Sequence, residues 1–140
     1  MKDIIFSFKK IYWFVVRPKT FGVKCIIQDN QGKILMLRKN FAYKGWVFPG
    51  GAIRQGEKPV DAIRREIKED LGITLENVHE LGSFFQRVHY RKETMYCFSA
   101  ITSSLVTDFN KEKIEEVGWF ERTQLPPLSP ISQSVMALFK

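Results

Sequence analysis

Residues 51–73 read GAIRQGEKPVDAIRREIKEDLGI, and this stretch decides how the chain folds. Apolar side chains recur in it at the three- and four-residue spacing of an amphipathic helix: Val60, Ile63, Ile67 and Leu71. Gly72 follows at once, and a glycine just past the last periodic residue is typical of a helix end. The pattern therefore predicts a helix over 58–71 with one buried face.

Acidic residues gather on the neighbouring edge of this helix: Glu66, Glu69 and Asp70. Residues three and four apart share a helix face, so the three fall within an arc of about 100°. Like charges this close repel each other, so they do not stabilise the helix. Their oxygens suit a hard divalent cation such as Mg²⁺. The ordinary alternative is a solvated face paired with Arg64, Arg65 and Lys68.

A glycine-rich segment precedes the helix. Residues 46–48 predict a short strand that Pro49-Gly50-Gly51 ends, and paired glycines let backbone groups approach a ligand closely. Glu57 places a further carboxylate at the start of the helix. The whole line is Gly51-x5-Glu57-x7-Arg65-Glu66-Ile67-x-Glu69-Asp70-x-Gly72-Ile73.

This line resembles the Nudix box, whose family pattern is G-x5-E-x7-R-E-U-x-E-E-x-G-U with U a bulky aliphatic residue. Every defined position matches except one, because Asp70 stands where the family has its last glutamate. The box covers 23 of the 140 residues, and the rest of the chain has no comparable motif. Nine residues at set spacing make chance agreement negligible.

The resemblance implies an α/β/α sandwich on a mixed β-sheet and hydrolysis of a nucleoside diphosphate derivative, assisted by Mg²⁺ or Mn²⁺. It implies that Glu57 and Arg65 brace the loop and helix. Aspartate keeps the charge of Asp70 but is one methylene shorter, so we expect activity to survive with a changed metal preference. The alternative is a nucleotide-binding module that has lost catalysis. The implied metal ligands are Glu66, Glu69, Asp70 and the carbonyl of Gly50.

Further site residues are expected outside the box. Nudix hydrolases often use one more glutamate on a late loop as base or ligand, and Glu112 or Glu116 would fill that role here, although most glutamates in such a loop are simply solvated. The candidates for substrate contacts are Arg38, Tyr43, Gly51 and Tyr90, for which a surface or core position is the ordinary alternative.

The other elements complete an α/β pattern. Polar residues 29–32 predict a hairpin turn, and the triplet Arg91-Lys92-Glu93 predicts a turn between two longer strands. Strands mixed with a few helices indicate α/β/α layers. The expected elements are an N-terminal helix or arm over 1–17, strands over 21–27, 34–37, 75–90, 94–102 and 117–120, and a helix over 131–139.

The composition favours a single-domain protein that does not span a membrane. The chain has the length of one domain, residues 1–140, with 44% hydrophobic residues and no apolar run of the roughly 20 residues that a membrane span needs. Cys25 and Cys97 lie in apolar runs, which favours reduced thiols, and with no recognisable signal peptide we expect a cytoplasmic protein.

The net charge of +7 favours an anionic partner. The chain lacks an RNA-binding motif, so we expect a nucleotide-type small molecule, and no nucleic acid except the 5′ end of an RNA. A monomer and a homodimer are equally compatible with the sequence.

Overall fold

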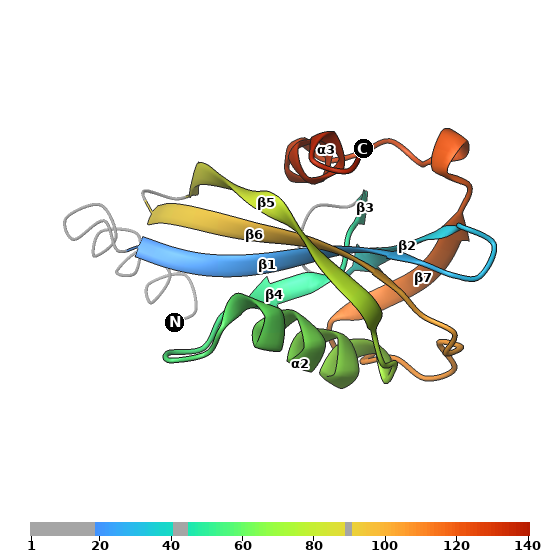
Figure 1. The fold of residues 1–140 in the computed structure, drawn as a ribbon. Helices are drawn as coiled ribbons and strands as arrows, with labels where there is room; N and C mark the ends of the chain where they lie inside the picture. Colours follow the sequence, from blue (N-terminus) through green and yellow to red (C-terminus); the bar gives the residue numbers. More distant parts are fainter. Residues whose placement is uncertain (1–18, 41–44, 89–90) are drawn as a thin grey trace, which may run out of the picture.

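The computed structural model describes residues 19–40, 45–88 and 91–140 (Figure 1). The expected N-terminal helix or arm over 1–17, and the candidate contacts Tyr43 and Tyr90, lie outside the described residues.

The described strands form one mixed sheet. Five of them follow the order β3-β2-β1-β6-β5, while β4 pairs with β1 and β7 pairs with β2. The β1–β6 pair is parallel, and the other pairs are antiparallel. The strands are β1 (Lys19–Gln28), β2 (Ile34–Lys39), β3 (Trp46–Val47), β4 (Gly50–Ala52), β5 (Glu76–Val88), β6 (Arg91–Ile101) and β7 (Ile114–Phe120).

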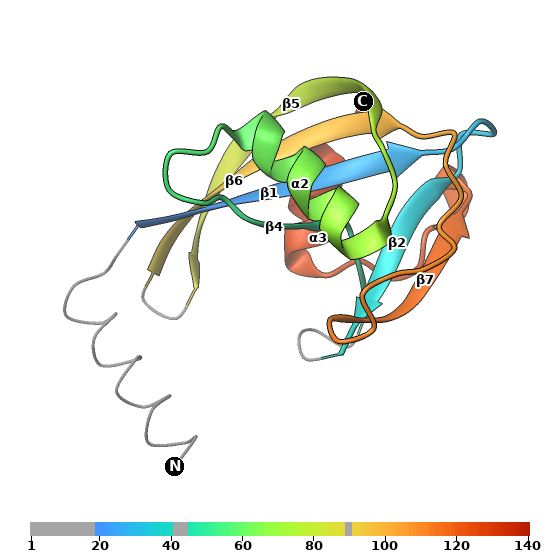
Figure 2. The same ribbon diagram turned by 90° about the horizontal axis from the view of Figure 1, so that it is seen from below.

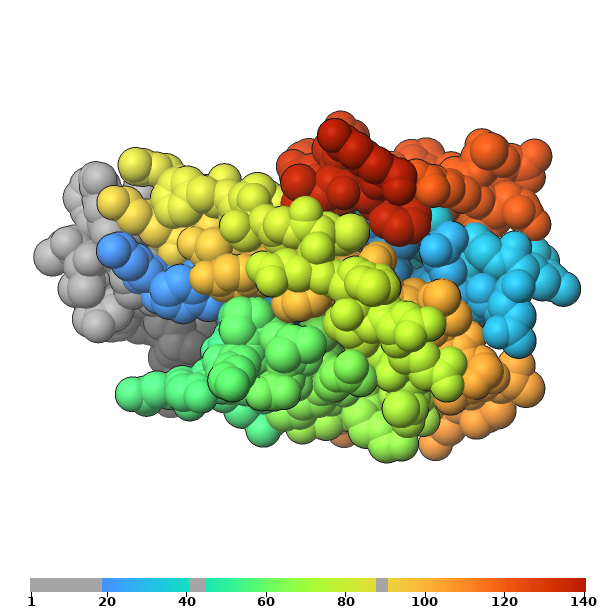
Figure 3. Space-filling model, viewed as in Figure 1, coloured from blue at the N-terminus to red at the C-terminus, as the bar shows by residue number. Residues whose placement is uncertain are grey.

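Two helices cover the two faces of this sheet, α2 (Pro59–Leu71) on one side and α3 (Pro130–Ala137) on the other, and a short 3-10 turn, η1 (Arg122–Gln124), precedes α3 (Figures 1 and 2). Strand β1 shows the division, because Val23 packs in the core beneath α2 and Ile26 packs in the core beneath α3. The edge strand β5 forms a band between the two helical layers (Figure 3). The expected α/β/α sandwich on a mixed sheet is confirmed.

Helix α2 begins and ends where its sequence predicts. Pro59 occupies the first turn, where its missing N–H costs no hydrogen bond. Gly72 ends the helix in a left-handed conformation with φ 68°, and its N–H donates to the carbonyl of Lys68 at 3.0 Å. The predicted apolar stripe is buried, since Ile63, Ile67 and Leu71 are at most 1% exposed.

The strands differ from the sequence-based expectation most clearly at two places, an unexpected strand β4 and the start of β6. Strand β4 was not expected, because Gly50-Gly51-Ala52 has low strand propensity; its pairing with β1 supplies the missing stabilisation. The turn predicted at 91–93 is wrong, since β6 already begins at Arg91. Polar residues resemble a turn in sequence, but here Lys92 pairs directly with Arg87 of β5.

The two cysteines are free and buried, as expected. Cys25 lies in the core beneath α2 and Cys97 in the core beneath α3, so the sheet separates them. Burial raises the pKa of Cys97 to about 11, which leaves this thiol protonated at neutral pH.

No helix among the described residues is long and apolar enough to span a membrane.

Candidate active site

Arg65 is the centre of the site at the start of α2. Its Nε donates to Glu57 Oε2 at 2.8 Å and its Nη2 donates to Glu57 Oε1 at 2.9 Å, a two-pronged contact that suits a planar guanidinium. Nη2 also donates to the carbonyl of Ala52 at 3.0 Å. Arg65 thereby joins three segments: strand β4, the loop that follows it and the helix.

Glu57 is held as a carboxylate by these contacts. It accepts the two hydrogen bonds from Arg65 and a third from the backbone N–H of Arg54 at 3.0 Å. The hydrogen bonds from Arg65 are the main cause that lowers the pKa of Glu57 to about 2. The same contacts raise the pKa of Arg65, so both groups remain charged across the physiological range.

Glu66 lies against the backbone of the glycine segment. Its Oε1 accepts from Arg65 Nη1 at 2.9 Å, and only 8% of the residue is exposed. A Cβ on Gly51 would stand 2.6 Å from both carboxylate oxygens, which is closer than a side chain tolerates. Glycine at position 51 therefore lets β4 and the carboxylate of Glu66 touch, and a larger residue there would displace this carboxylate.

Glu69 stands one turn further at the solvent. Its Oε2 lies 3.4 Å from Arg65 Nη1, the same nitrogen that contacts Glu66, so the two carboxylates are neighbours. Its Oε1 lies 3.4 Å from Arg54 Nη2, and its side chain is 45% exposed. Two adjacent carboxylates, one buried and one accessible, form an acidic edge beside Gly51.

Asp70 takes no part in the contacts around Arg65. Its Oδ1 lies 3.6 Å from Lys113 Nζ and makes no hydrogen bond, although only 4% of the residue is exposed. Its backbone carbonyl accepts from the N–H of Asn110 at 2.8 Å, which ties the end of α2 to the loop before β7. The structure therefore brings Glu57, Glu66 and Glu69 together around Arg65 but leaves Asp70 facing Lys113.

The donor set fits a hard divalent cation in its chemistry. Within the described ranges, no group of three or more acidic, histidine or cysteine side chains is already arranged as a metal site. Glu66 and Glu69 nevertheless offer adjacent oxygens, and Asp70 Oδ1 is a buried acceptor that makes no hydrogen bond and has only the ion pair with Lys113. Gly50 lies on β4 directly before Gly51, the residue that touches Glu66.

Sequence reasoning missed a buried cation on the other face of the sheet. Lys24 pairs with Gly50 in the β1–β4 ladder, and its Nζ donates to the carbonyl of Phe48 at 3.2 Å. Burial, and secondarily the charge of Lys39, lower the pKa of Lys24 to about 8. The signal was present in the sequence, because Lys24 is the one charged residue in the run 21–27.

A cavity of about 430 Å³ opens beside Lys24. Its wall is formed by Lys24, Lys39 and Val47 on the sheet, and by residues 129–132 at the start of α3. Ser129 begins this helix by accepting a hydrogen bond from the N–H of Ser132 at 3.1 Å.

The remaining candidates lie along β2 and β7. Arg38 forms ion pairs with Glu115 at 3.3 Å and Glu116 at 3.1 Å, and its guanidinium lies 5.7 Å from the ring centre of Trp46. The expected phosphate contact and one expected base are thus paired with each other. Glu112 is exposed, and its side chain forms no ion pair with any residue that the structure describes.

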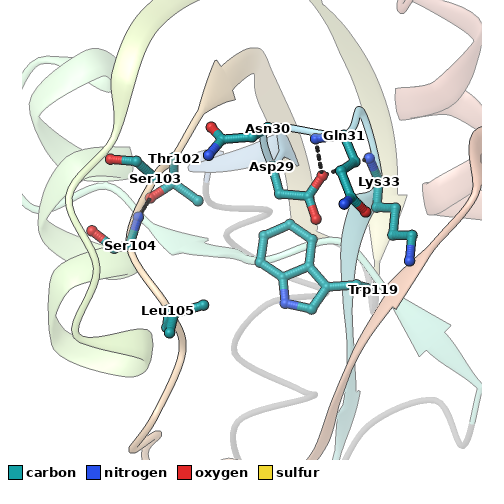
Figure 4. A pocket seen from close by; sticks show the side chains of 9 residues that line it. All are labelled: Asp29, Asn30, Gln31, Lys33, Thr102, Ser103, Ser104, Leu105 and Trp119. Carbon is teal, nitrogen blue, oxygen red and sulfur yellow. Dashed lines mark hydrogen bonds between the residues drawn. The ribbon is translucent and has the colours of Figure 1, made fainter.

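A second cavity, of about 360 Å³, lies at the β1–β2 hairpin (Figure 4). Trp119 and Leu105 form part of its wall, and Asp29 lies at its rim. The carboxylate of Asp29 accepts the backbone N–H groups of Gln31 and Lys33, each at 2.9 Å. Since the polar group at this rim serves the turn, the cavity adds no chemistry to the acidic edge.

One family model and one of the curated relatives match most of the chain, and two other relatives match about half of it. The model described as NUDIX domain matches residues 18–139. An RNA pyrophosphohydrolase from Bartonella clarridgeiae is 31% identical over 155 aligned residues, covering 90% of this chain and 86% of that protein. An RNA pyrophosphohydrolase from Thioalkalivibrio sulfidiphilus is 38% identical over 66 residues, or 47% of this chain. The chain spans 38% of that relative and 41% of the one from Saccharophagus degradans.

Solved structures share the fold. A MutT NUDIX hydrolase from Burkholderia pseudomallei superposes with a TM-score of 0.78 at 25% identity, over 87% of this chain and 98% of that one. The NUDIX domain of Shewanella oneidensis NrtR, solved with ADP ribose, superposes with a TM-score of 0.74 at 15% identity, over 89% of this chain and 88% of that one. The second likeness concerns the fold alone.

Proposed function

The chain belongs to the Nudix family, and on that premise we propose that it hydrolyses a phosphoanhydride bond of a nucleoside diphosphate derivative with a divalent metal. The substrate classes are a nucleoside triphosphate, a dinucleoside polyphosphate or a nucleotide sugar. The observation that carries the proposal is the pair of neighbouring carboxylates, Glu66 and Glu69, which share Arg65 Nη1 beside Gly51.

In the proposed mechanism, the residues that would hold Mg²⁺ or Mn²⁺ are Glu66, Glu69 and Asp70, with the carbonyl of Gly50. A metal held there would neutralise charge on the phosphate and lower the pKa of a water molecule. The water oxygen bonds to phosphorus, the P–O bond to the leaving phosphate or nucleotide breaks, and the proton of the water passes to solvent. Catalysis of this kind depends on positioning and charge, so it needs no covalent nucleophile from the chain.

Arg65 acts in this mechanism as a positioning residue. Its contacts with Glu57 fix the loop to the helix, and its contact with Glu66 orients that carboxylate. Arg54, with a side chain that is 65% exposed beside Glu69, is free to turn toward an anionic substrate. Lys24 and Lys39 add positive charge on the other side of β4, where they attract the phosphates of a nucleotide.

A nucleotide-binding module without turnover is the second candidate. The ion pair between Asp70 and Lys113 supports it, because a lysine near an expected metal ligand weakens metal binding. Tight nucleotide binding with no phosphate release under any metal would favour this candidate.

The test is release of phosphate or nucleoside monophosphate from a panel of nucleotides, with Mg²⁺ and with Mn²⁺. The panel includes ADP-ribose and a 5′-triphosphorylated RNA, which the names of the matched proteins suggest. We expect turnover on at least one substrate and complete loss on adding a chelator. Chelator-resistant turnover would contradict the proposed metal chemistry.

A single substitution locates the reaction at the acidic edge. Glu69→Gln removes one charge from an exposed side chain, so we expect turnover to fall at least about 100-fold while the unfolding temperature stays the same. Glu76→Gln, which makes the same change at an exposed position at the start of β5, is the matched control. Unchanged turnover in Glu69→Gln would remove this residue from the proposed metal site.

We also propose a cytoplasmic location, on the grounds of the two free thiols and the nucleotide substrate.

A further inference from the structure

One end of the sheet extends beyond the start of α2 (Figures 1 and 2). Three strands reach this end: β1, β6 and β5. Further along them, Val23 and Tyr96 pair across β1 and β6, and both pack in the core beneath α2. Because side chains alternate along a strand, every second residue toward this end continues the same face past the helix.

Three cations form a row across that face. The register places Lys19 of β1 next to Lys92 of β6, and Lys92 next to Arg87 of β5. No ion pair joins any of the three to another described residue. Like charges directly opposite each other destabilise a sheet, so the fold gains nothing from this row. A negatively charged partner bound to this row would reduce the repulsion among the three cations.

Two phenylalanines form part of the neighbouring row. Phe21 of β1 pairs with Thr94 of β6, which pairs with Phe85 of β5. Phe21 is 45% exposed and Phe85 is 55% exposed, although aromatic side chains ordinarily contribute most when buried. The two residues lie two strands apart, which corresponds to about 10 Å between their backbones across the sheet.

This face leads directly to the acidic edge. A cavity of about 530 Å³ is lined by Lys19 and Phe21 on one side and by residues 52–57 on the other. That loop carries Glu57, which contacts Arg65, and Arg54, which contacts Glu69. The same loop therefore borders both this cavity and the acidic edge, so a ligand with its phosphoanhydride at that edge lies one loop away from Lys19 and Phe21.

We propose that this basic and aromatic face binds the single-stranded nucleotides that follow the 5′ end of an RNA substrate. We call it the cation–phenylalanine face and define it by Lys19, Phe21, Phe85, Arg87 and Lys92. Cations that follow a phosphate backbone, together with exposed aromatic rings that stack on bases, are the combination by which proteins bind single strands. The inference rests on the proposed function and names the 5′ end of an RNA as the nucleoside diphosphate derivative that is hydrolysed.

The first test measures binding without chemistry. The probe is a fluorescent RNA of eight nucleotides with a 5′-hydroxyl end, followed by anisotropy at several salt concentrations. We expect Phe85→Ala to weaken binding about 5- to 10-fold through lost stacking. We expect Arg87→Glu to weaken it at least as much and to reduce the salt dependence by about one phosphate contact. Leu105→Ala and Lys33→Glu, at exposed or half-exposed positions around the β1–β2 hairpin cavity, are the matched controls.

The second test compares kcat/KM on the same RNA carrying a 5′-triphosphate with kcat/KM on a nucleoside triphosphate. We expect the ratio to exceed one in the natural chain, to fall in Phe85→Ala and Arg87→Glu, and to stay constant in both controls. A ratio below one, or a ratio that the two variants leave unchanged, would overturn the RNA inference while leaving the proposed hydrolysis intact.

The binding test separates the other outcomes. No turnover on any substrate, with RNA binding that the variants weaken, would refute the proposed function and support the face. Binding to phosphatidylserine vesicles that exceeds binding to RNA, and that the same variants abolish, would overturn the inference in favour of a lipid surface. Equal RNA binding by the variants and the natural chain would also overturn it.

Discussion

Arg65 and Lys24 are enclosed cations on the two sides of the short strand β4, and their surroundings differ sharply. Arg65 has the oxygens of three carboxylates between 2.8 and 3.4 Å from its nitrogens. Lys24 has one carbonyl at 3.2 Å and, among the residues described, no carboxylate within ion-pair distance. The pKa of Arg65 is raised by its partners, and that of Lys24 is lowered to about 8 by burial.

The difference shows how the protein divides its charges. The contacts of Arg65 hold the acidic edge in shape, and they are satisfied within the chain. Lys24 remains undercompensated beside a cavity, where it costs stability and is available to an anionic ligand. The role of Lys24 in binding the phosphates of the substrate therefore stays part of the proposed function.

Gly51→Ala disrupts the carboxylate contacts around Arg65, and of the three variants we expect it to have the largest effect on turnover. The added methyl group overlaps the carboxylate of Glu66, which must move away from Arg65. We expect turnover to fall about 100-fold and the free energy of unfolding to drop by about 1–3 kcal/mol. Steady-state kinetics and urea unfolding measure the two effects. Ala52→Ser, at the exposed neighbouring position, is the control, and equal activity in both variants would refute the close contact.

Lys24→Met tests how much stability the chain loses by holding the charged Lys24 side chain away from water. At pH 7, Lys24 is charged in both folded and unfolded chains, so the folded chain carries the full desolvation cost. The pKa shift from 10.5 to about 8, at roughly 1.4 kcal/mol for each unit, sets an upper bound of about 3.5 kcal/mol. Because Lys24 is half-buried and partly solvated, we expect the variant to be more stable by about 1–3 kcal/mol. The variant should also bind nucleotide more weakly.

The stability difference between Lys24→Met and the natural chain depends on pH, and its direction follows from the lowered pKa of Lys24. As the pH rises through 8, folded Lys24 loses its proton while the unfolded chain keeps it until about 10.5, so the natural chain becomes more stable. The stability gap between Lys24→Met and the natural chain should therefore close between these pH values, as urea unfolding at a series of pH values measures. A gap that does not change with pH would mean that burial does not lower the pKa.

Glu57→Gln sharpens the comparison from the acidic side. Of the three variants we expect it to change stability the least, and its effect is fully present at neutral pH. The pKa of Glu57 falls from 4.5 to about 2 on folding, so its contribution is complete above pH 4.5 and is lost as the pH falls toward 2. The natural chain should therefore lose its stability advantage over the variant across this window. A constant difference in unfolding free energy from pH 6 to pH 2 would contradict the role given to Arg65.

Helix α2 and its acidic edge were predictable because they depend on residues that are close together in the sequence. The periodic apolar residues of α2, its glycine end and the spacing of Glu66 and Glu69 all lie within one continuous stretch. Neighbours on a helix are neighbours in sequence, so the shared face follows from the spacing. The roles of all the predicted site residues remain predictions, including those of Asp70, Glu112 and Glu116.

Strand β4 and the start of β6 depend on pairing with strands that are distant in the sequence, so the local sequence did not predict them. Strand β4 exists because Gly50 and Gly51 fit against β1, and nothing in Gly-Gly-Ala itself favours a strand. Arg91, Lys92 and Glu93 resemble a turn in sequence but extend β6, because β1 and β5 lie on either side of them. Propensity is a weak guide where distant partners supply the hydrogen bonds.

Residues 51–73 alone predicted the family, and through it the layered α/β architecture, because the motif is continuous in sequence. The shared face of the α2 carboxylates followed from helical spacing. Three features needed the folded chain: Arg65 joins Glu57, Glu66 and Glu69, Asp70 faces Lys113, and Lys24 borders a cavity. The tertiary structure alone set Lys19, Arg87 and Lys92 in one row. Those three residues are up to 73 positions apart in the chain, and strand register, which depends on the packing of the whole sheet, brings them together.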